Sequence, residues 1–246
     1  MPCQIKLDEK PVLNNPVLIE GLPGIGFVAN ILALHFIKEL KAKRFARIFS
    51  ASFQDMAVTT EKGEPRTPIN ELYYCRSGTR DLIIWYGNTQ ALTAFGQYEL
   101  CGRVLDLAEE LGCKYIITIG GFKIEEPKEV PEVYCAASDH ETLKEALNLG
   151  TKIMVGNIFG IAGILIALGG LRGLRGFSLL VETTGLYPDA KAAGYALKVL
   201  NKFLGLNVDP SGLEDAAEET AKILESFGWV RPSDKQKKGE EFRWFV

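Results

Sequence analysis

Residues 16–40 read PVLIEGLPGIGFVANILALHFIKEL and contain three patterns in succession. The apolar residues 17–19 are typical of a buried strand, and Gly21, Gly24 and Gly26 then surround a proline in a turn. Residues 27–37 are apolar on almost every side, which is typical of a helix buried in a core. A strand, a glycine turn and a buried helix form the opening unit of an α/β domain.

The glycine turn raises the question of nucleotide binding. Residues 24–29 read GIGFVA and fit the G-x-G-x-x-A pattern of a dinucleotide-binding turn. Such a site also needs an acidic residue at the end of the second strand, but the predicted second strand, residues 45–51, ends in serine and alanine. The lysine of a phosphate-binding loop is missing after Gly26 as well. We therefore interpret these glycines as residues for a tight turn and close packing of the helix on the sheet.

Composition favours an ordinary globular protein in a reducing compartment. The 246 residues are 47% hydrophobic, and a net charge of -3 gives no reason to expect nucleic acid or an anionic membrane as partner. The five cysteines are far apart and form no C-x-x-C pair, which favours free thiols in a cytoplasmic protein. The polar N-terminus has no apolar segment of a signal peptide.

Residues 153–171, IMVGNIFGIAGILIALGGL, carry no charge and are nearly long enough to cross a bilayer. Five glycines interrupt this segment, and its neighbours have the pattern of buried α/β elements. We predict a buried core helix here, because a sheet covered on both faces makes its elements unusually apolar.

Strands alternate with helices over most of the chain, which predicts a single-domain α/β/α sandwich with a mixed, mostly parallel sheet. The strands expected at residues 71–76 and 81–86 form a hairpin, which makes the sheet mixed. We place this domain at residues 1–228. Residues 229–246 are polar and mixed in charge, and we expect a flexible C-terminal arm there.

Catalytic groups are sparse. His35 lies in the apolar helix, His140 begins a charged one, and no nucleophile elbow or metal-ligand spacing occurs. Four glutamates of residues 125–132 lie on a loop between prolines, which is typical of a solvated loop. Polar residues at the strand ends 88–90, 120–121 and 182–184 fall where α/β proteins bind small ligands. We expect no enzyme, no metal and no cofactor; a nucleotide- or nucleoside-binding enzyme that uses the glycine turn 21–26 is the alternative.

The last three residues, Trp244, Phe245 and Val246, form an aromatic end to the predicted arm. A free carboxylate beside two aromatic rings suits insertion into an apolar groove of a partner, where a lysine or backbone N–H groups bind the carboxylate. Two alternatives are that these residues fold back on their own domain, or that they latch a neighbouring subunit in a structural homo-oligomer.

Six motifs follow one another along the chain: VLIEGLPGIGFVAN at 17–30, DLIIWYGNTQ at 81–90, GQYE at 96–99, YIITIGGF at 115–122, NIFGIAG at 157–163 and ETTGLYPD at 182–189. This ordered set resembles the PAC2 family of proteasome assembly chaperones, above all its archaeal members, and the resemblance runs from about residue 17 to residue 224.

This resemblance implies a sandwich related to the nucleoside-phosphorylase fold, a homo-oligomer, and no cofactor. It also implies a role for the C-terminus, because proteasome chaperones and activators can end in a hydrophobic-Tyr-any motif that enters pockets between α-ring subunits of the 20S proteasome. Trp244, Phe245 and Val246 are similar to that motif, with Phe245 in place of the tyrosine. The phenylalanine keeps the ring but lacks the phenol hydrogen bond. The resemblance therefore predicts an ATP-independent assembly chaperone or adaptor that binds 20S α-subunits.

Overall fold

The computed structural model describes residues 3–59 and 62–226 of the chain. The strands in this part are β1 (Gln4–Leu7), β2 (Val17–Gly21), β3 (Lys43–Phe49), β4 (Val58–Thr59), β5 (Pro65–Arg66), β6 (Asn70–Cys75), β7 (Leu82–Gly87), β8 (Tyr115–Lys123), β9 (Val133–Ala137), β10 (Lys152–Ile153) and β11 (Arg175–Thr183). The α-helices are α1 (Val28–Glu39), α2 (Ala94–Glu110), α3 (His140–Asn148), α4 (Ile161–Leu171), α5 (Ala190–Leu204) and α6 (Leu213–Ser226). Short 3-10 helices precede α1 (Ile25–Phe27) and α6 (Pro210–Gly212).

One nine-stranded sheet organises the described chain, in the order β1-β3-β6-β7-β2-β8-β11-β9-β10. The pairings β7–β2, β2–β8, β8–β11 and β9–β10 are parallel, and the other four are antiparallel. The predicted mixed sheet and the hairpin, now β6 and β7, are confirmed. The expected parallel majority is instead an even division, because the hairpin continues through β3 and β1 and because β9 folds back along β11.

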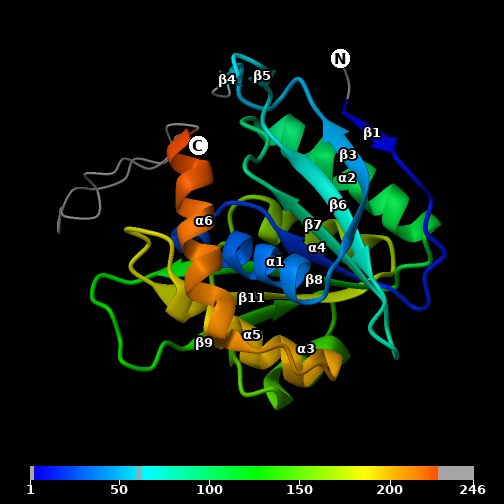
Figure 1. Cartoon of the computed structure of the whole chain (residues 1–246). Coiled ribbons are helices and arrows are strands. Elements are labelled where there is room, and N and C mark those ends of the chain that lie inside the picture. The colour runs from blue at the N-terminus through cyan, green and yellow to red at the C-terminus, as the bar shows by residue number, and fades with distance from the viewer. Residues whose placement is uncertain (1–2, 60–61, 227–246) are drawn as a thin grey trace.

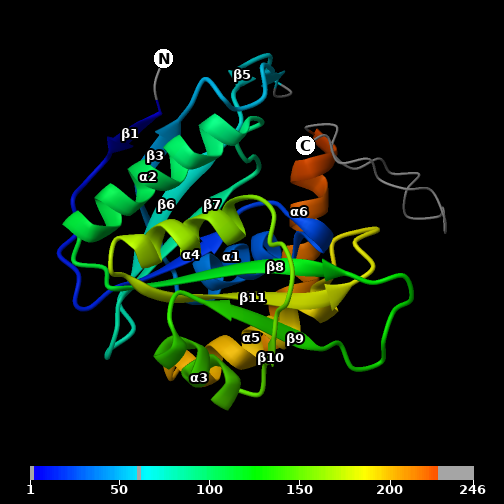
Figure 2. The ribbon, with the colours of Figure 1, turned by 180° about the vertical axis from the view of Figure 1, so that it is seen from behind.

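Helices cover both faces of this sheet (Figures 1 and 2). Helices α1, α3, α5 and α6 enclose one apolar core, and α2 and α4 enclose the other. Strand β2 contributes to both cores, with Val17 and Ile19 in the first and Leu18 in the second. Side chains alternate between the faces of a strand, so a strand that is covered on both sides is apolar throughout. This confirms the predicted α/β/α sandwich and the buried strand of residues 17–19.

Aspartate side chains cap α3, α5 and the 3-10 helix before α6. The Asp139 carboxylate accepts a hydrogen bond from the Thr142 N–H at 2.8 Å at the start of α3, and Asp209 accepts from the Ser211 N–H at 2.9 Å before α6. At α5 the N-cap is Asp189, whose carboxylate accepts from the Ala192 N–H at 2.8 Å. Pro188 lies immediately before this cap and therefore precedes α5.

The apolar segment 153–171 differs most from the prediction. Residues Lys152–Ile153 pair with β9, and the helix α4 begins only at Ile161. Gly156 and Gly160 have φ values of +125° and +76°, which a continuing α-helix does not allow. Phe159 and Leu171 are exposed, so the predicted buried core helix is wrong for about half of the segment. None of the helices in the described residues is both long and apolar enough to span a membrane.

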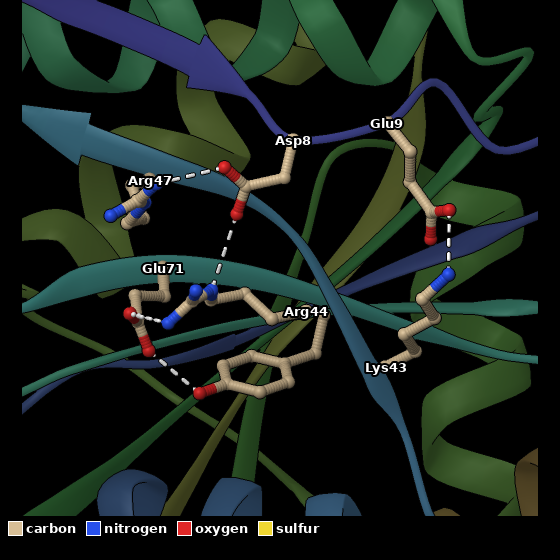
Figure 3. Close-up of polar contacts among 7 residues, drawn as sticks. Asp8, Glu9, Lys43, Arg44, Arg47 and Glu71 are labelled. Atoms are coloured by element: carbon tan, nitrogen blue, oxygen red, sulfur yellow. Dashed lines mark hydrogen bonds and ion pairs between the residues drawn. The ribbon is translucent and has the colours of Figure 1, made fainter.

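The edge of the sheet at β1 is rich in charge (Figure 3). Asp8, just after β1, pairs with Arg47 at 2.9 Å and with Arg44 at 3.4 Å, and Arg44 also pairs with Glu71 at 2.8 Å. Next to them, Lys43 pairs with Glu9 at 2.6 Å. Charged side chains on an edge strand discourage pairing with the edge of another molecule.

Candidate functional site

The glycine turn packs against the ends of β8 and β11. A Cβ on Gly26 would lie 2.8 Å from the Thr183 Oγ1, and a Cβ on Gly121 would lie 2.2 Å from the Ile25 carbonyl oxygen. The Gly26 carbonyl accepts a hydrogen bond from the Asp189 N–H at 2.9 Å. Protein atoms therefore fill the space beside Gly26 and Gly121, whereas a dinucleotide site needs room for pyrophosphate beside the glycine turn.

The three glycines of the turn differ in what they permit. A Cβ on Gly21 would lie 2.1 Å from the Ala33 Cβ, so this glycine lets α1 approach β2 closely. Gly26 has φ +64°, a left-handed conformation that favours glycine, whereas nothing lies within 4 Å of a Cβ on Gly24. The packing interpretation is thus confirmed at Gly21 and Gly26, and sterics do not require glycine at position 24.

The polar residues 88–90 bind other parts of the chain. The Asn88 Oδ1 accepts from the Ile69 N–H at 2.7 Å, and the Gln90 amide donates to the Pro23 carbonyl at 2.5 Å. Asn30 on α1, which the sequence analysis missed, donates to the carbonyls of Gly21 and Gly87 at 3.1 and 2.6 Å. These contacts join the ends of β2 and β7, and they use the Asn88 Oδ1 and the Gln90 amide, which were predicted to meet a ligand.

A closed ion-pair cluster lies beside the end of β11. The buried Glu182 binds the Lys128 ammonium at 2.6 Å and accepts from the Glu132 N–H at 2.9 Å, while the Tyr134 hydroxyl lies 2.6 Å from the Glu132 carboxylate. Lys152 also pairs with Glu132. Burial opposes ionisation of Glu182, but the Lys128 ammonium, the Glu132 N–H and the Tyr134 hydroxyl together outweigh it and hold the pKa of Glu182 below its ordinary value.

This cluster corrects one interpretation from the sequence. Glu125, Glu126 and Glu129 are exposed, as expected for a solvated loop, but Glu132 is half-buried and joins the charges above. Two lysines balance two glutamates in it, and no nucleophile stands next to a base. The cluster therefore anchors the loop 124–132 to the sheet.

The remaining candidates for chemistry are structural. The His35 Nε2 lies 2.7 Å from the Asp209 carbonyl oxygen inside the protein, as a core histidine does. All five cysteines are free and buried, as predicted, and burial raises the pKa of Cys3 and of Cys75 to about 11. Within residues 3–59 and 62–226, no group of three His, Cys, Asp or Glu could hold a metal ion.

The predicted docking residues Trp244, Phe245 and Val246 lie outside the described residues, as does the whole predicted arm 229–246. Their role stays a prediction.

Comparison with known proteins identifies the family. The sequence pattern of the PAC2 family matches residues 18–227, from β2 to the residue after α6. The chain belongs to the PAC2 family. Its relatives include MJ1210 of Methanocaldococcus jannaschii, which is 31% identical over 89% of this chain and 86% of its own length.

Two solved structures resemble this PAC2 protein over nearly its whole length. The archaeal proteasome activator PbaB of Pyrococcus furiosus is 36% identical and has a TM-score of 0.82, covering 92% of this chain and 99% of PbaB. PbaA of the same organism, an archaeal homolog of proteasome-assembly chaperone, is 30% identical with a TM-score of 0.75, covering 93% of this chain and 92% of PbaA. The resemblance to the PAC2 family seen in the sequence is therefore confirmed, and so is the archaeal character of the relatives.

Proposed function

We propose that this PAC2 protein is a proteasome assembly chaperone or activator that binds α-subunits of the 20S proteasome without using ATP. The observation that carries the proposal is the similarity to PbaB, a proteasome activator, over 92% of the chain. The similarity to PbaA, a homolog of proteasome-assembly chaperone, supports the same class of partner.

A binding role without catalysis agrees with the described residues. Thr183 and the Asp189 backbone pack against Gly26 of the glycine turn. At the end of β7, the Gln90 amide binds the Pro23 carbonyl of the same chain. The alternative of a nucleotide- or nucleoside-binding enzyme therefore gains no support from the turn 21–26. We infer that the protein acts through surfaces, as a cytoplasmic homo-oligomer.

The docking element that we propose is the C-terminus, with residues 1–228 as the domain and residues 229–246 as the arm. Trp244 and Phe245 would fill an apolar slot between α-subunits, and the Val246 carboxylate would meet a lysine or backbone N–H groups. A homo-oligomer presents several such ends at once. After one end is bound, the others bind at a high effective concentration, so modest affinity of each end suffices.

Deletion of residues 244–246 tests this role. Loss of two buried aromatic anchors removes at least about 2 kcal/mol of binding free energy, so the affinity for immobilised 20S proteasome falls about 30-fold or more in surface plasmon resonance. A variant with one glycine added after Val246 keeps both rings but displaces the carboxylate, and it should also bind weakly. Gln236→Ala is the matched control within the predicted arm and should bind as the wild type does.

Two results would contradict the docking role. Unchanged affinity of the deletion variant would remove the C-terminus from the interface. A deletion variant that binds 20S proteasome normally but has a smaller particle mass would instead support the intersubunit latch.

A further inference from the structure

Helix α4 is apolar on its outer face as well as on its inner one. Ile161 and Leu165 are buried against the sheet, while Ala167 and Leu171 are exposed. A helix that is apolar all round is normally buried, yet α4 lies in the outer layer. Its 11 residues are also too few to cross a bilayer. Protein is therefore the expected cover for this face.

Helix α2 extends the apolar surface beside α4. The two helices lie side by side in Figure 2, and Arg172 after α4 pairs with Asp106 and Glu109 of α2 at 2.7 and 3.0 Å. Phe95 and Tyr98 precede Asp106 at helical spacing, so they lie on the same side of α2, toward α4. The Gln90 Oε1, just before α2, accepts a hydrogen bond from the Ile161 N–H at 3.4 Å and so joins the beginnings of both helices.

The segment 154–160 completes this surface. It runs from β10 across the same face of the sheet to the start of α4 (Figure 2). We call the whole surface the α2–α4 face and define it by Phe95, Tyr98, Val155, Phe159, Ala167 and Leu171. The exposed fractions of its large side chains are 77% for Phe95, 55% for Tyr98, 87% for Val155, 82% for Phe159 and 86% for Leu171.

The area of the α2–α4 face is that of a protein interface. At 150–250 Å² for each aromatic side chain, the three exposed rings alone present roughly 400 Å². The largest apolar patch of a typical monomer covers about 300–600 Å², and one partner in a standard interface buries about 800 Å². The aliphatic side chains of α4 and of segment 154–160 bring this face toward the second value.

The charges favour a second copy of the chain as the cover. A twofold contact brings each residue near its own counterpart, so a charge near the axis meets a like charge. Residues Ile161–Leu171 contain no ionisable side chain, and Arg172 at their end is balanced by two carboxylates. Helix α6, from which residues 227–246 continue, packs on the opposite face of the sheet with α1 and α5.

We propose that a second copy of this chain packs on the α2–α4 face, in a twofold contact centred on α4. The proposed function includes a homo-oligomer, and this contact is the surface through which two of its chains pack. The proposal rests on the proposed function only because it takes the homo-oligomer from it. The contact also leaves α6 of both copies on the outer sides of the pair, because α6 packs on the opposite face of the sheet.

The test measures the mass of the full-length protein by light scattering after gel filtration. The wild type should have at least twice the 27.1 kDa of one chain. Ala167→Glu places like charges near the axis and should reduce the mass to 27.1 kDa with an unchanged circular dichroism spectrum, because Ala167 is exposed. Val12→Glu is the matched control, since Val12 is 86% exposed outside this face, and should keep the wild-type mass.

Cross-linking gives a second readout that does not depend on a disruptive charge. All five native cysteines are buried, so Ala167→Cys provides the exposed thiol for a short bismaleimide. A cross-linked pair of chains is expected. A monomeric wild type would overturn the proposal, and so would an Ala167→Glu variant that keeps the mass of the wild-type oligomer. The proposal would also be wrong if the chain's own C-terminus covered the thiol of Ala167→Cys. Binding to 20S proteasome is measured separately, so a monomer that still binds would overturn this contact and not the proposed function.

Discussion

Gly24 and Gly26 belong to one motif but have different surroundings. Gly26 has a left-handed conformation, and its Cβ position lies against Thr183. The Thr183 hydroxyl in turn donates to the Asp189 carboxylate at 2.6 Å, and Asp189 caps α5. Gly24 has an extended backbone with φ -153° and free space at its Cβ position. Of the two glycines that match the cofactor motif, Gly26 is therefore needed for packing and Gly24 is not.

We therefore expect Gly26→Ala to be destabilising and Gly24→Ala to be nearly neutral. The left-handed backbone costs a non-glycine residue about 1–2 kcal/mol, and displacement of Thr183 adds to it, for roughly 2–3 kcal/mol in all. In a chain of this size such a loss lowers the Tm by about 4–12 °C, whereas Gly24→Ala should change it by less than about 2 °C. Calorimetry measures both, and equal losses would contradict the packing role of Gly26.

Glu20 is a buried acid at the end of β2. Its side chain is 1% exposed, its Oε1 accepts from the Leu22 N–H at 2.8 Å, and no described residue bonds to its Oε2. Burial raises the pKa of Glu20 to about 8, against the opposing effect of the Leu22 and Ile119 N–H groups. Burial and the Glu20 charge also hold the pKa of the nearby Cys101 thiol far above its usual range, so this thiol stays neutral.

This raised pKa predicts stability that falls with increasing pH. Between the unfolded value of 4.5 and the folded value of about 8, the folded state holds a proton that the unfolded state has lost. The free energy of unfolding should therefore fall by roughly 1 kcal/mol per pH unit in this window and level off above it. Glu20→Gln has no proton to lose, so its stability relative to the wild type should rise from pH 5 to pH 8.

Urea unfolding at each pH measures the difference between these two proteins. Glu126→Gln, at an exposed position, is the control and should follow the wild-type curve. Parallel curves for Glu20→Gln and the wild type would show that Glu20 ionises in the folded protein as it does in the unfolded chain.

At the scale of elements, the sequence predicts the strands, turns and helices that depend on residues close together in the chain. The strand β2, the glycine turn and α1 follow from the apolar run, the glycines and the buried helix of residues 16–40. The caps Asp139 and Asp209 follow from side chains that bond the next turn. Strand β8 continues through Gly120 and Gly121 to Lys123, because these glycines allow close contact with Ile25 and Leu180 from distant parts of the chain.

The misassigned segment 153–171 shows a different limit. Its composition is that of a core helix. Composition does not reveal whether an apolar surface is buried by the same chain or by another one. The ion pairs of Glu182 with Lys128 were missed for a related reason, since 54 residues separate the partners in sequence. Of the candidate site, the sequence therefore predicted the packing role of the glycines but not the contacts between distant segments or the exposed α2–α4 face.

At the scale of the whole molecule, the α2–α4 face and α6 lie on opposite sides of the sheet. A contact through the α2–α4 face therefore does not cover α6. Under the proposed function, assembly and docking are coupled in energy, because each added copy would bring another C-terminal docking segment to the same proteasome ring.

This coupling predicts that a monomer binds 20S proteasome more weakly, although its docking residues are intact. Linked sites gain about 10²-fold or more in affinity over single ones, so Ala167→Glu should lose at least about tenfold on immobilised 20S proteasome while Val12→Glu should not. A synthetic peptide of residues 229–246 should bind with the affinity of the Ala167→Glu monomer, since each has one arm. If the Ala167→Glu monomer instead bound as tightly as the wild type, one chain would supply the whole interface, and multivalent docking would be wrong.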